Sequence, residues 1–314
     1  MNATGPQYLR LSVTARCNLA CVYCRSGGQA VAQDELTVGD LRFVVACAAA
    51  EGVRKVRITG GEPLQRADLE EVVAAVRSVR GVREIGLTTN GIGLAGRLPA
   101  LKRAGLDRVN VSLDSLRPEM FARLTGADPA AHPEVLEAIA AAAETCPPAK
   151  INAVMLAGRN DREPGDFVRL GGRLGVRVRF IEYYGPPAGA EDCAAVPPDE
   201  VMRRITEEFG EVLPVGGDPL SVEEVYQVPA LGDATFGLVR SASGPPCARC
   251  NKLRLTAAGV LLPCLFAARG KNLWEEVRRR DEAAVRRAVR DVYAAKERSG
   301  PAGRTVACTR EIGG

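Results

Sequence analysis

The sequence predicts an α/β protein built as an incomplete (β/α)6 barrel of the TIM type. Six short β-rich runs alternate with Ala- and Val-rich helical stretches between residues 8 and 184, which is the pattern of parallel strands joined by crossover helices. Polar and apolar residues alternate within most of these runs, so each strand has one polar and one apolar face. Six units are fewer than a closed barrel needs, so the interior would be open and able to hold a polar ligand.

The predicted strands are Tyr8–Thr14, Lys55–Thr59, Glu84–Thr89, Arg108–Leu113, Lys150–Met155 and Arg177–Tyr184. The clearest helices between them are Asp40–Glu51, Asp68–Val79 and Glu134–Thr145. If the apolar faces meet the helices, the polar faces line the interior; they carry Arg10, Arg57, Ser112 and Lys150. The sixth run breaks the pattern, because Arg177 and Arg179 are out of phase with Glu182. A flat doubly wound sheet with solvated edges is the alternative that alternation alone leaves open.

The composition changes after the sixth run. Pro, Gly and Ala dominate from about residue 185 to 217, apart from one amphipathic helix at Pro198–Phe209. We place a domain boundary near Pro214, which divides the chain into a barrel at residues 1–214 and a C-terminal region at residues 215–314. Two short strands are expected in that region, at Val222–Val228 and Ala234–Val239.

Charge and hydropathy exclude several classes of protein. The 314 residues carry a net charge of +4, with Lys and Arg interleaved among Asp and Glu, so no basic stripe predicts nucleic-acid binding. An anionic small substrate is compatible with this balance. The polar N-terminus predicts no signal peptide, and the lack of eighteen consecutive apolar residues predicts no membrane span. We therefore expect a cytoplasmic protein.

Three cysteines directly follow the first strand. Cys17, Cys21 and Cys24 fall within eight residues, and thiolates at this density are soft ligands typical of a metal centre. A closed structural site takes four protein ligands, so a set of three leaves one metal position open for a ligand or substrate. Three unrelated buried thiols, or half of a zinc site, are the alternatives.

Short polar motifs end the next three strands. Gly60-Gly61-Glu62-Pro63 follows the second strand, Thr88-Thr89-Asn90-Gly91 ends the third, and Ser112 ends the fourth. Paired glycines at a strand end let backbone approach a ligand closely. With the cysteine loop, these motifs resemble the radical S-adenosylmethionine (SAM) superfamily. The resemblance implies a 4Fe–4S cluster on the three thiols, SAM at its free iron, and SAM contacts from Tyr23, Gly61, Ser112 and Tyr184.

A second set of cysteines lies near the C-terminal end. Cys247 and Cys250 are followed by Cys264, and a zinc ribbon would need a fourth ligand close to Cys264. The single histidine, His132, is distant, while zinc completed by Cys308 stays open. A second iron–sulfur cluster with three protein ligands fits better.

The run from Cys247 to Phe266, together with the terminal Gly313-Gly314, resembles the GTP 3′,8-cyclase family of molybdenum cofactor synthesis. The resemblance implies two 4Fe–4S clusters, with the guanine of GTP at the free iron of the second. It implies GTP contacts from Arg10, Arg57, Thr88, Lys150, Lys252 and Arg254. It also assigns Arg254, Gly313 and Gly314 to catalysis, with the Gly-Gly tail threading into the site; an ordinary frayed terminus is the alternative.

The resemblance further implies the reaction and the partners. Reductive cleavage of SAM would give a radical that takes hydrogen from C3′ of the GTP ribose, and the carbon radical would add to C8 of guanine. The implied partners are an electron donor and a downstream pterin-forming enzyme, and a homodimer is one arrangement that the family allows.

Three departures from the family concern the substrate. Lys252 stands where the family has Arg, Tyr184 stands where it has Met, and the loop 185–196 is shorter. Two other functions therefore compete with the cyclase. One is a paralogous twin-cluster radical SAM enzyme that acts on another nucleotide or a peptide. The other is an iron–sulfur or zinc binding module without enzymatic activity.

Overall fold

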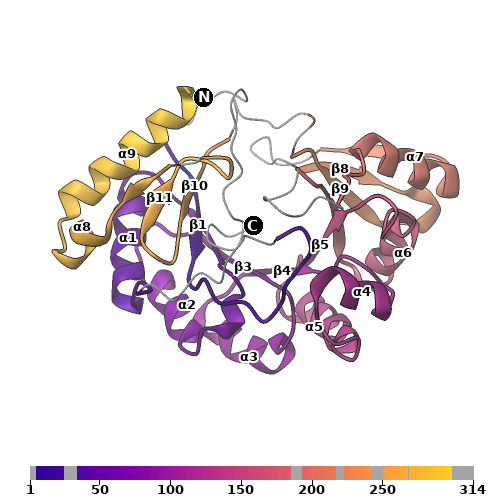
Figure 1. Ribbon diagram of the computed structural model, residues 1–314, viewed down its shortest axis with the longest axis horizontal. Coiled ribbons are helices and arrows are strands. Elements are labelled where there is room, and N and C mark those ends of the chain that lie inside the picture. Colours follow the sequence, from indigo (N-terminus) through magenta and orange to yellow (C-terminus); the bar gives the residue numbers. More distant parts are fainter. Residues whose placement is uncertain are drawn as a thin grey trace.

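Six parallel strands form the centre of the fold in the computed structural model, which describes residues 5–24, 34–184, 193–216, 223–241, 243, 250–267 and 269–298. They are β1 (Tyr8–Ser12), β2 (Lys55–Thr59), β3 (Glu84–Thr89), β4 (Arg108–Ser112), β5 (Lys150–Met155) and β6 (Arg177–Glu182). The sheet curves into an open arc with the helices on its outer side (Figure 1). Because a doubly wound sheet carries helices on both faces, this arrangement confirms the predicted incomplete barrel.

Helices connect these strands along the outside of the arc. They are α1 (Val38–Ala50), η1 (Pro63–Gln65), α2 (Leu69–Arg77), α3 (Leu94–Ala104), α4 (Pro118–Thr125), α5 (Ala131–Thr145), α6 (Pro164–Leu174) and, after β6, α7 (Pro198–Phe209). A capping box fixes the start of α1: the Asp40 N–H donates to Thr37 Oγ1, and the Asp40 carboxylate accepts from the Thr37 N–H. The capping box therefore fixes the direction in which the chain before Thr37 enters α1.

The two faces of the strands differ as predicted. Leu9, Leu11 and Ile58 are fully buried toward the helices. In the alternate positions, Arg10 of β1 lies beside Arg57 of β2, and both face the interior. As expected, β6 departs from the simple alternation, because Arg177 and Arg179 lie on the face opposite Glu182. Arg177 pairs in register with Lys150 and Arg179 with Asn152, so both arginines belong to the inner face.

Glu182 is the residue of β6 that lies on the opposite face. Its carboxylate accepts hydrogen bonds from the backbone N–H of Ser243, at 2.9 Å, and from the Ser243 hydroxyl. Glu182 therefore breaks the alternation because its carboxylate binds the segment that follows β9.

Residues after α7 extend this sheet at both edges. At one edge β10 (Lys252–Leu255) runs parallel to β1, followed by β11 (Val260–Leu262) and β12 (Lys271–Asn272). At the other edge β9 (Thr235–Val239) runs parallel to β6, followed by β8 (Glu223–Gln227) and β7 (Leu213–Val215). The short helix α8 (Trp274–Arg278) and the 17-residue helix α9 (Glu282–Arg298) pack near α1. The division at residue 214 stays a prediction.

None of the helices in the described part of the chain combines the length and apolarity that a bilayer crossing requires.

The packing of β9 on β6 generates a prediction for Phe236→Ala. Phe180 of β6 contacts Phe167 of α6 and Phe236 of β9, with ring centroids 6.2 and 6.0 Å apart, and all three rings are buried. We expect the substitution to lower the free energy of unfolding by about 3–5 kcal/mol. Urea unfolding followed by circular dichroism measures it. An unchanged main transition would mean that β9 folds independently of the barrel.

Candidate active site

The loop that carries Cys17, Cys21 and Cys24 lies across the carboxyl ends of the strands (Figure 1). Its backbone is held by the last turn of α4, since the N–H of Ala20 donates to the carbonyl of Thr125 at 2.8 Å and that of Val22 donates to Leu124 at 2.9 Å. These bonds hold the loop at the carboxyl end of the barrel, where active sites of this fold lie.

The donor set of this loop fits a cluster better than a single ion. The pKa of Cys21 is raised, first by burial and then by Asp114 and the thiols of Cys24 and Cys17, so the three thiols lie within electrostatic reach of one another. The N–H of Leu19 points at Cys17 Sγ, 3.4 Å away. Among the described residues, no three Cys, His, Asp or Glu side chains are placed to hold one metal ion. An iron–sulfur cube offers a separate iron to each thiolate and spaces its ligands more widely.

Gly60 and Gly61 make room for the backbone that leads into the thiol loop. A Cβ at Gly60 would lie 2.5 Å from the carbonyl oxygen of Thr14, and one at Gly61 would lie 2.2 Å from that of Arg16. The N–H of Gly61 donates to Thr14 O, and the N–H of Glu62 donates to Arg16 O, each at 2.7 Å. The glycine pair is therefore required by the crossing chain, and the SAM contact at Gly61 stays a prediction.

The buried Glu62 carboxylate links this crossing to the end of β3. It accepts hydrogen bonds from the Thr89 hydroxyl and from the backbone N–H of Asn90, both at 2.7 Å. The Asn90 amide in turn donates to Asn18 Oδ1 at 2.8 Å. Because Asn18 follows Cys17 directly, the polar motifs after β2 and β3 together orient the thiol loop.

Tyr23 anchors the far end of the loop. Its hydroxyl donates to Asp114 Oδ2 at 2.5 Å, and Asp114 Oδ1 accepts from the N–H of Val154 at 2.8 Å. Burial raises the pKa of Asp114 to about 6, although both hydrogen bonds lower it. Ser112 lies on the inner face beside Asn152. The SAM contacts predicted for Tyr23 and Ser112 stay predictions.

Cys250 and Cys264 flank two paired strands. Cys250 lies before β10 and Cys264 lies after β11, which are antiparallel neighbours. Lys296 of α9 donates to the carbonyls of Lys252 and Pro263, at 2.8 and 2.5 Å, and so ties the two strand ends together. Burial would raise the pKa of Cys250, but Lys296, the Lys252 N–H and the Lys252 charge lower it. Cys247, Gly313 and Gly314 lie outside the described residues.

Tyr184 stands between the two thiol sets. Its ring meets that of Phe266 edge-on, with centroids 5.3 Å apart. Burial raises its pKa, Arg254 and Arg10 lower it, and the Cys24 thiol raises it, so the phenol faces the first thiol set and the inner arginines together. The pKa of Arg254 also responds to Cys264 and Cys250. Cys24 of the first set, and Cys250 and Cys264 of the second, therefore lie near the same inner arginines.

This interior is strongly cationic. Arg10, Arg57 and Arg254 lie side by side on three adjacent strands. Burial, with the nearby charge of Arg10, lowers the pKa of Arg254 to about 9, and burial lowers that of Lys252 to about 8. A cavity of about 740 Å³ lies at the amino ends of the strands, where Arg57 and Lys252 line it together with Lys150, Arg177 and Arg179. Such a cavity is suited to a polyanion.

Arg57 is held over a strand glycine. Its Nε donates to the Tyr8 hydroxyl at 3.1 Å and its Nη1 donates to the carbonyl of Leu87 at 3.3 Å. A Cβ at Gly86 would lie 2.3 Å from Arg57 Cζ, so the missing side chain leaves room for the guanidinium. Burial raises the pKa of Tyr8, yet Arg57 and Arg10 bring it down to about 7.

Sequence reasoning missed three residues of the cavity: Arg177, Arg179 and Glu223. The side chain of Glu223 is 4% exposed, and its Oε2 lies 2.5 Å from Lys150 Nζ. Its carboxylate also faces Arg177 Nη1 at 3.6 Å and Arg179 Nη1 at 3.9 Å. The two-residue spacing of the arginines was a usable signal. Glu223 carried none, since its place depends on the pairing of β8 with β9.

Thr88 is a further inner residue with an unused polar group. It pairs in register with Asn110 on the inner face, and its hydroxyl oxygen is buried without a hydrogen-bond partner among the described residues. Because a buried hydroxyl without a partner costs free energy, a ligand atom on the inner face of β3 would stabilise it.

Comparisons with known proteins address the whole chain. The family described as "Radical SAM superfamily" matches residues 11–171, and "Molybdenum Cofactor Synthesis C" matches residues 176–300. A GTP 3′,8-cyclase of Aquifex aeolicus is 39% identical, covering 84% of this chain and 83% of the relative. One of Pelotomaculum thermopropionicum is 42% identical, covering 85% and 83%. One of Geobacter sulfurreducens is 38% identical, covering 93% and 91%.

Solved structures show a likeness in fold. Streptococcus suis SuiB bound to S-adenosylmethionine superposes with a TM-score of 0.64 at 18% identity. The match covers 87% of this chain and 64% of SuiB, so this chain spans less than two thirds of that protein. At this identity the likeness concerns the fold alone.

The position of Arg57 generates a prediction for Gly86→Ala. The added methyl group overlaps the guanidinium, so Arg57 must leave its place above β3. We expect binding of inorganic tripolyphosphate to weaken by about tenfold, the loss of one charge-assisted hydrogen bond, as measured by calorimetry. Gly96→Ala is the control, because a Cβ at Gly96 in α3 meets nothing within 4 Å. Equal affinities in the two variants would contradict the assigned role of Arg57.

Proposed function

Since this chain belongs to the radical SAM superfamily and, within it, to the GTP 3′,8-cyclases, we propose that it converts GTP into the 3′,8-cyclised nucleotide in molybdenum cofactor synthesis. One observation supports this most directly: Cys24 of the first set and Cys250 and Cys264 of the second lie near one row of inner arginines, with Tyr184 near Cys24 and Arg254. A metal-binding module needs neither a second set nor such a row of arginines.

We propose that each thiol set holds a 4Fe–4S cluster. Cys17, Cys21 and Cys24 would hold the first, and Cys247, Cys250 and Cys264 the second. When bound, the first cluster and SAM would supply the radical that takes a hydrogen atom from C3′ of the ribose. SAM would be contacted by Tyr23, Gly61, Ser112 and Tyr184. The protein itself positions the substrate and excludes water.

The inner cations are proposed to hold the triphosphate. The set consists of the predicted Arg10, Arg57, Lys150, Lys252 and Arg254, with Arg177 and Arg179 added. Several buried cations on one inner face repel one another and lose hydration, so a polyanion is the partner that stabilises them. In the structure Glu223 provides part of that negative charge, and the unpartnered Thr88 hydroxyl could meet an oxygen of the same ligand.

Other parts of the proposal concern partners and the tail. Arg254, Gly313 and Gly314 are proposed to act in catalysis. The electron donor, the downstream pterin-forming enzyme, a homodimer and the cytoplasmic location stay predictions.

The proposal is tested anaerobically with reconstituted protein. We expect each triple Cys→Ala variant, one for each thiol set, to lose about half of the iron and sulfide. Reduced wild type with SAM and GTP should yield 5′-deoxyadenosine and a cyclised guanine nucleotide. Formation of 5′-deoxyadenosine without the cyclised product would favour the paralogous enzyme. Zinc in place of iron, with SAM left intact, would favour the binding module.

Lys150 generates a prediction about pH. Burial and the neighbouring Arg179 lower its pKa to about 8, while Glu223 raises it. Lys150 is therefore cationic below pH 8 and loses its charge above it. We expect Lys150→Met to raise the KM for GTP by about tenfold at pH 7, and by much less at pH 9. Lys252 and Tyr8 also titrate in this range. They are present in both wild type and Lys150→Met, so the ratio of the two KM values reports on Lys150.

Lys150→Arg is the matched control for this experiment. Its guanidinium stays charged across the range, so we expect the control to keep a low KM at pH 9. A KM ratio between Lys150→Met and wild type that is the same at pH 7 and pH 9 would show that the charge of Lys150 does not contribute to binding.

A further inference from the structure

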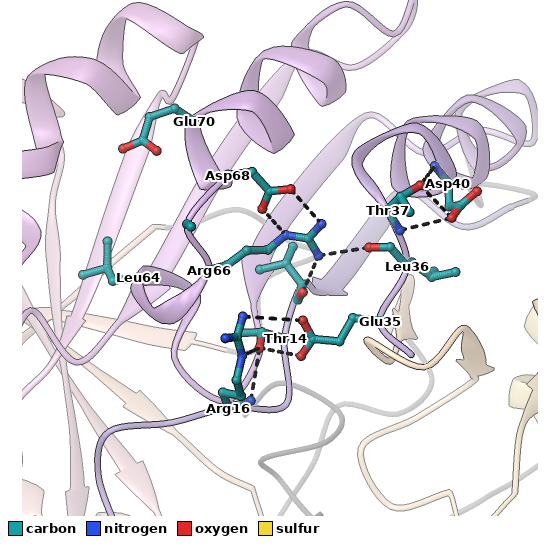
Figure 2. A network of polar contacts seen from close by, with 12 residues as sticks. Thr14, Arg16, Glu35, Leu36, Thr37, Asp40, Leu64, Arg66, Asp68 and Glu70 are labelled. Atoms are coloured by element: carbon teal, nitrogen blue, oxygen red, sulfur yellow. Dashed lines mark hydrogen bonds and ion pairs between the residues drawn. The ribbon is translucent and has the colours of Figure 1, made fainter. Parts of the chain in front are cut away.

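The guanidinium of Arg66 bonds the chain on both sides of the three cysteines. We call residues 13–16 the outgoing leg of the thiol loop and residues 35–36 its returning leg. Arg66 follows η1 and is 6% exposed. Its Nη1 donates to the carbonyl of Val13 at 2.6 Å and to that of Leu36 at 3.0 Å. Val13 precedes the three cysteines and Leu36 follows them. A single nitrogen therefore closes the base of the loop (Figure 2).

Other contacts fix the orientation of Arg66. Its Nε and Nη2 donate to the two oxygens of Asp68, at 2.6 and 3.3 Å. On its backbone side, Arg97 donates to the carbonyls of Leu64 and Arg66, at 2.9 and 3.2 Å. Because the Asp68 carboxylate binds Nε and Nη2 of Arg66, the guanidinium is fixed with Nη1 directed at the thiol loop.

Glu35 adds a second tie next to the first. Its Oε1 accepts from the Thr14 hydroxyl at 2.6 Å and from the backbone N–H of Ala15 at 3.0 Å, and its Oε2 lies 3.8 Å from Arg16 Nη2. Figure 2 shows Glu35 on the returning leg, facing Thr14 and Arg16 on the outgoing leg. The ties through Arg66 and Glu35 thus join adjacent positions of the two legs.

We propose that Arg66, supported by Glu35, is a positioning residue that holds the two legs of the thiol loop at the spacing at which Cys17, Cys21 and Cys24 retain a cluster. This inference rests on the proposed first cluster. The barrel itself does not depend on these ties, since β1 and β2 are joined by their own ladder. Loss of the guanidinium leaves two carbonyls without their partner and frees the legs to separate, which costs the site its preorganisation.

Two further contacts hold the chain after the cysteines and limit the expected effect. The N–H of Leu36 donates to the carbonyl of Ala257, between β10 and β11, at 3.0 Å, and Thr37 caps α1. The leg therefore stays near its place without Arg66, and a cluster would be held less firmly instead of being lost outright.

The test measures iron release to a chelator from reconstituted protein. We expect Arg66→Met to release the iron of the first set about tenfold faster than wild type, with the iron of the second set released at the wild-type rate. A variant lacking Cys247, Cys250 and Cys264 isolates the first set. Arg66→Lys should recover part of the retention, because an ammonium can reach one carbonyl but cannot keep the fork to Asp68.

Arg77→Met is the matched control. Arg77 of α2 also joins a backbone carbonyl, that of Gly105 at 2.6 Å, to a carboxylate, that of Asp107, but it lies away from the thiol loop. Faster release in both variants would mean general destabilisation and would overturn the proposal. Wild-type release in Arg66→Met would overturn it as well.

Two further measurements separate the possible failures. If Arg66→Met does not fold, as judged by circular dichroism, Glu35→Gln replaces it. We then expect a smaller acceleration, several-fold, and none would refute the tie. If the Cys17, Cys21 and Cys24 triple variant holds as much iron as wild type, the proposed first cluster is wrong. The positioning role of Arg66 is then rejected with it. An altered electron paramagnetic resonance spectrum of reduced Arg66→Met, with and without SAM, would support the positioning role.

Discussion

The structure depends on confining positive charge within a low-dielectric interior. Arg10, Arg57 and Arg254 are neighbours across three strands, and burial lowers the pKa of Arg10 and Arg254. Such a set is stable only when negative charge is close by. Glu223 meets this need on one side of the barrel, and the acidified phenol of Tyr8 meets it on the other. The remaining imbalance is what favours a polyanionic substrate.

Each thiol set is braced by a cation that bonds backbone carbonyls beside the cysteines. Arg66 bonds Val13 and Leu36 around the first set, and Lys296 bonds Lys252 and Pro263 around the second. This arrangement has a chemical reason. Bonds to carbonyls fix the chain beside the thiols. Lys296 also bonds the Cys250 thiol and lowers its pKa, which favours the thiolate form that binds metal.

Strand alternation predicted the barrel and much of its lining, because a period of two sets the face of each side chain irrespective of distant partners. Arg10, Arg57 and Lys150 were found in this way. Arg177 and Arg179 were not assigned to the lining, because Glu182 of the same strand is out of phase with them. Glu182 lies on the other face of β6 and accepts a hydrogen bond from Ser243. Glu223, Arg66 and Lys296 were out of reach, since contacts between segments far apart in the sequence define their roles. The glycines at 60 and 61 predicted a close approach, but the approaching group was the thiol loop itself.

The strands after α7 belong to the same sheet as the barrel strands. β10 lies against β1 and β9 lies against β6, so the chain after α7 completes both edges of the arc. One edge supplies Lys252, Arg254 and the second thiol set, and the other supplies Glu223. Arg10 of β1 and Arg57 of β2 lie in the same row as Arg254 of β10. The cations of β5 and β6 face Glu223 of β8. Because each half of the interior takes its partners from one edge of the sheet, the site is complete only when both C-terminal edges are assembled on the barrel.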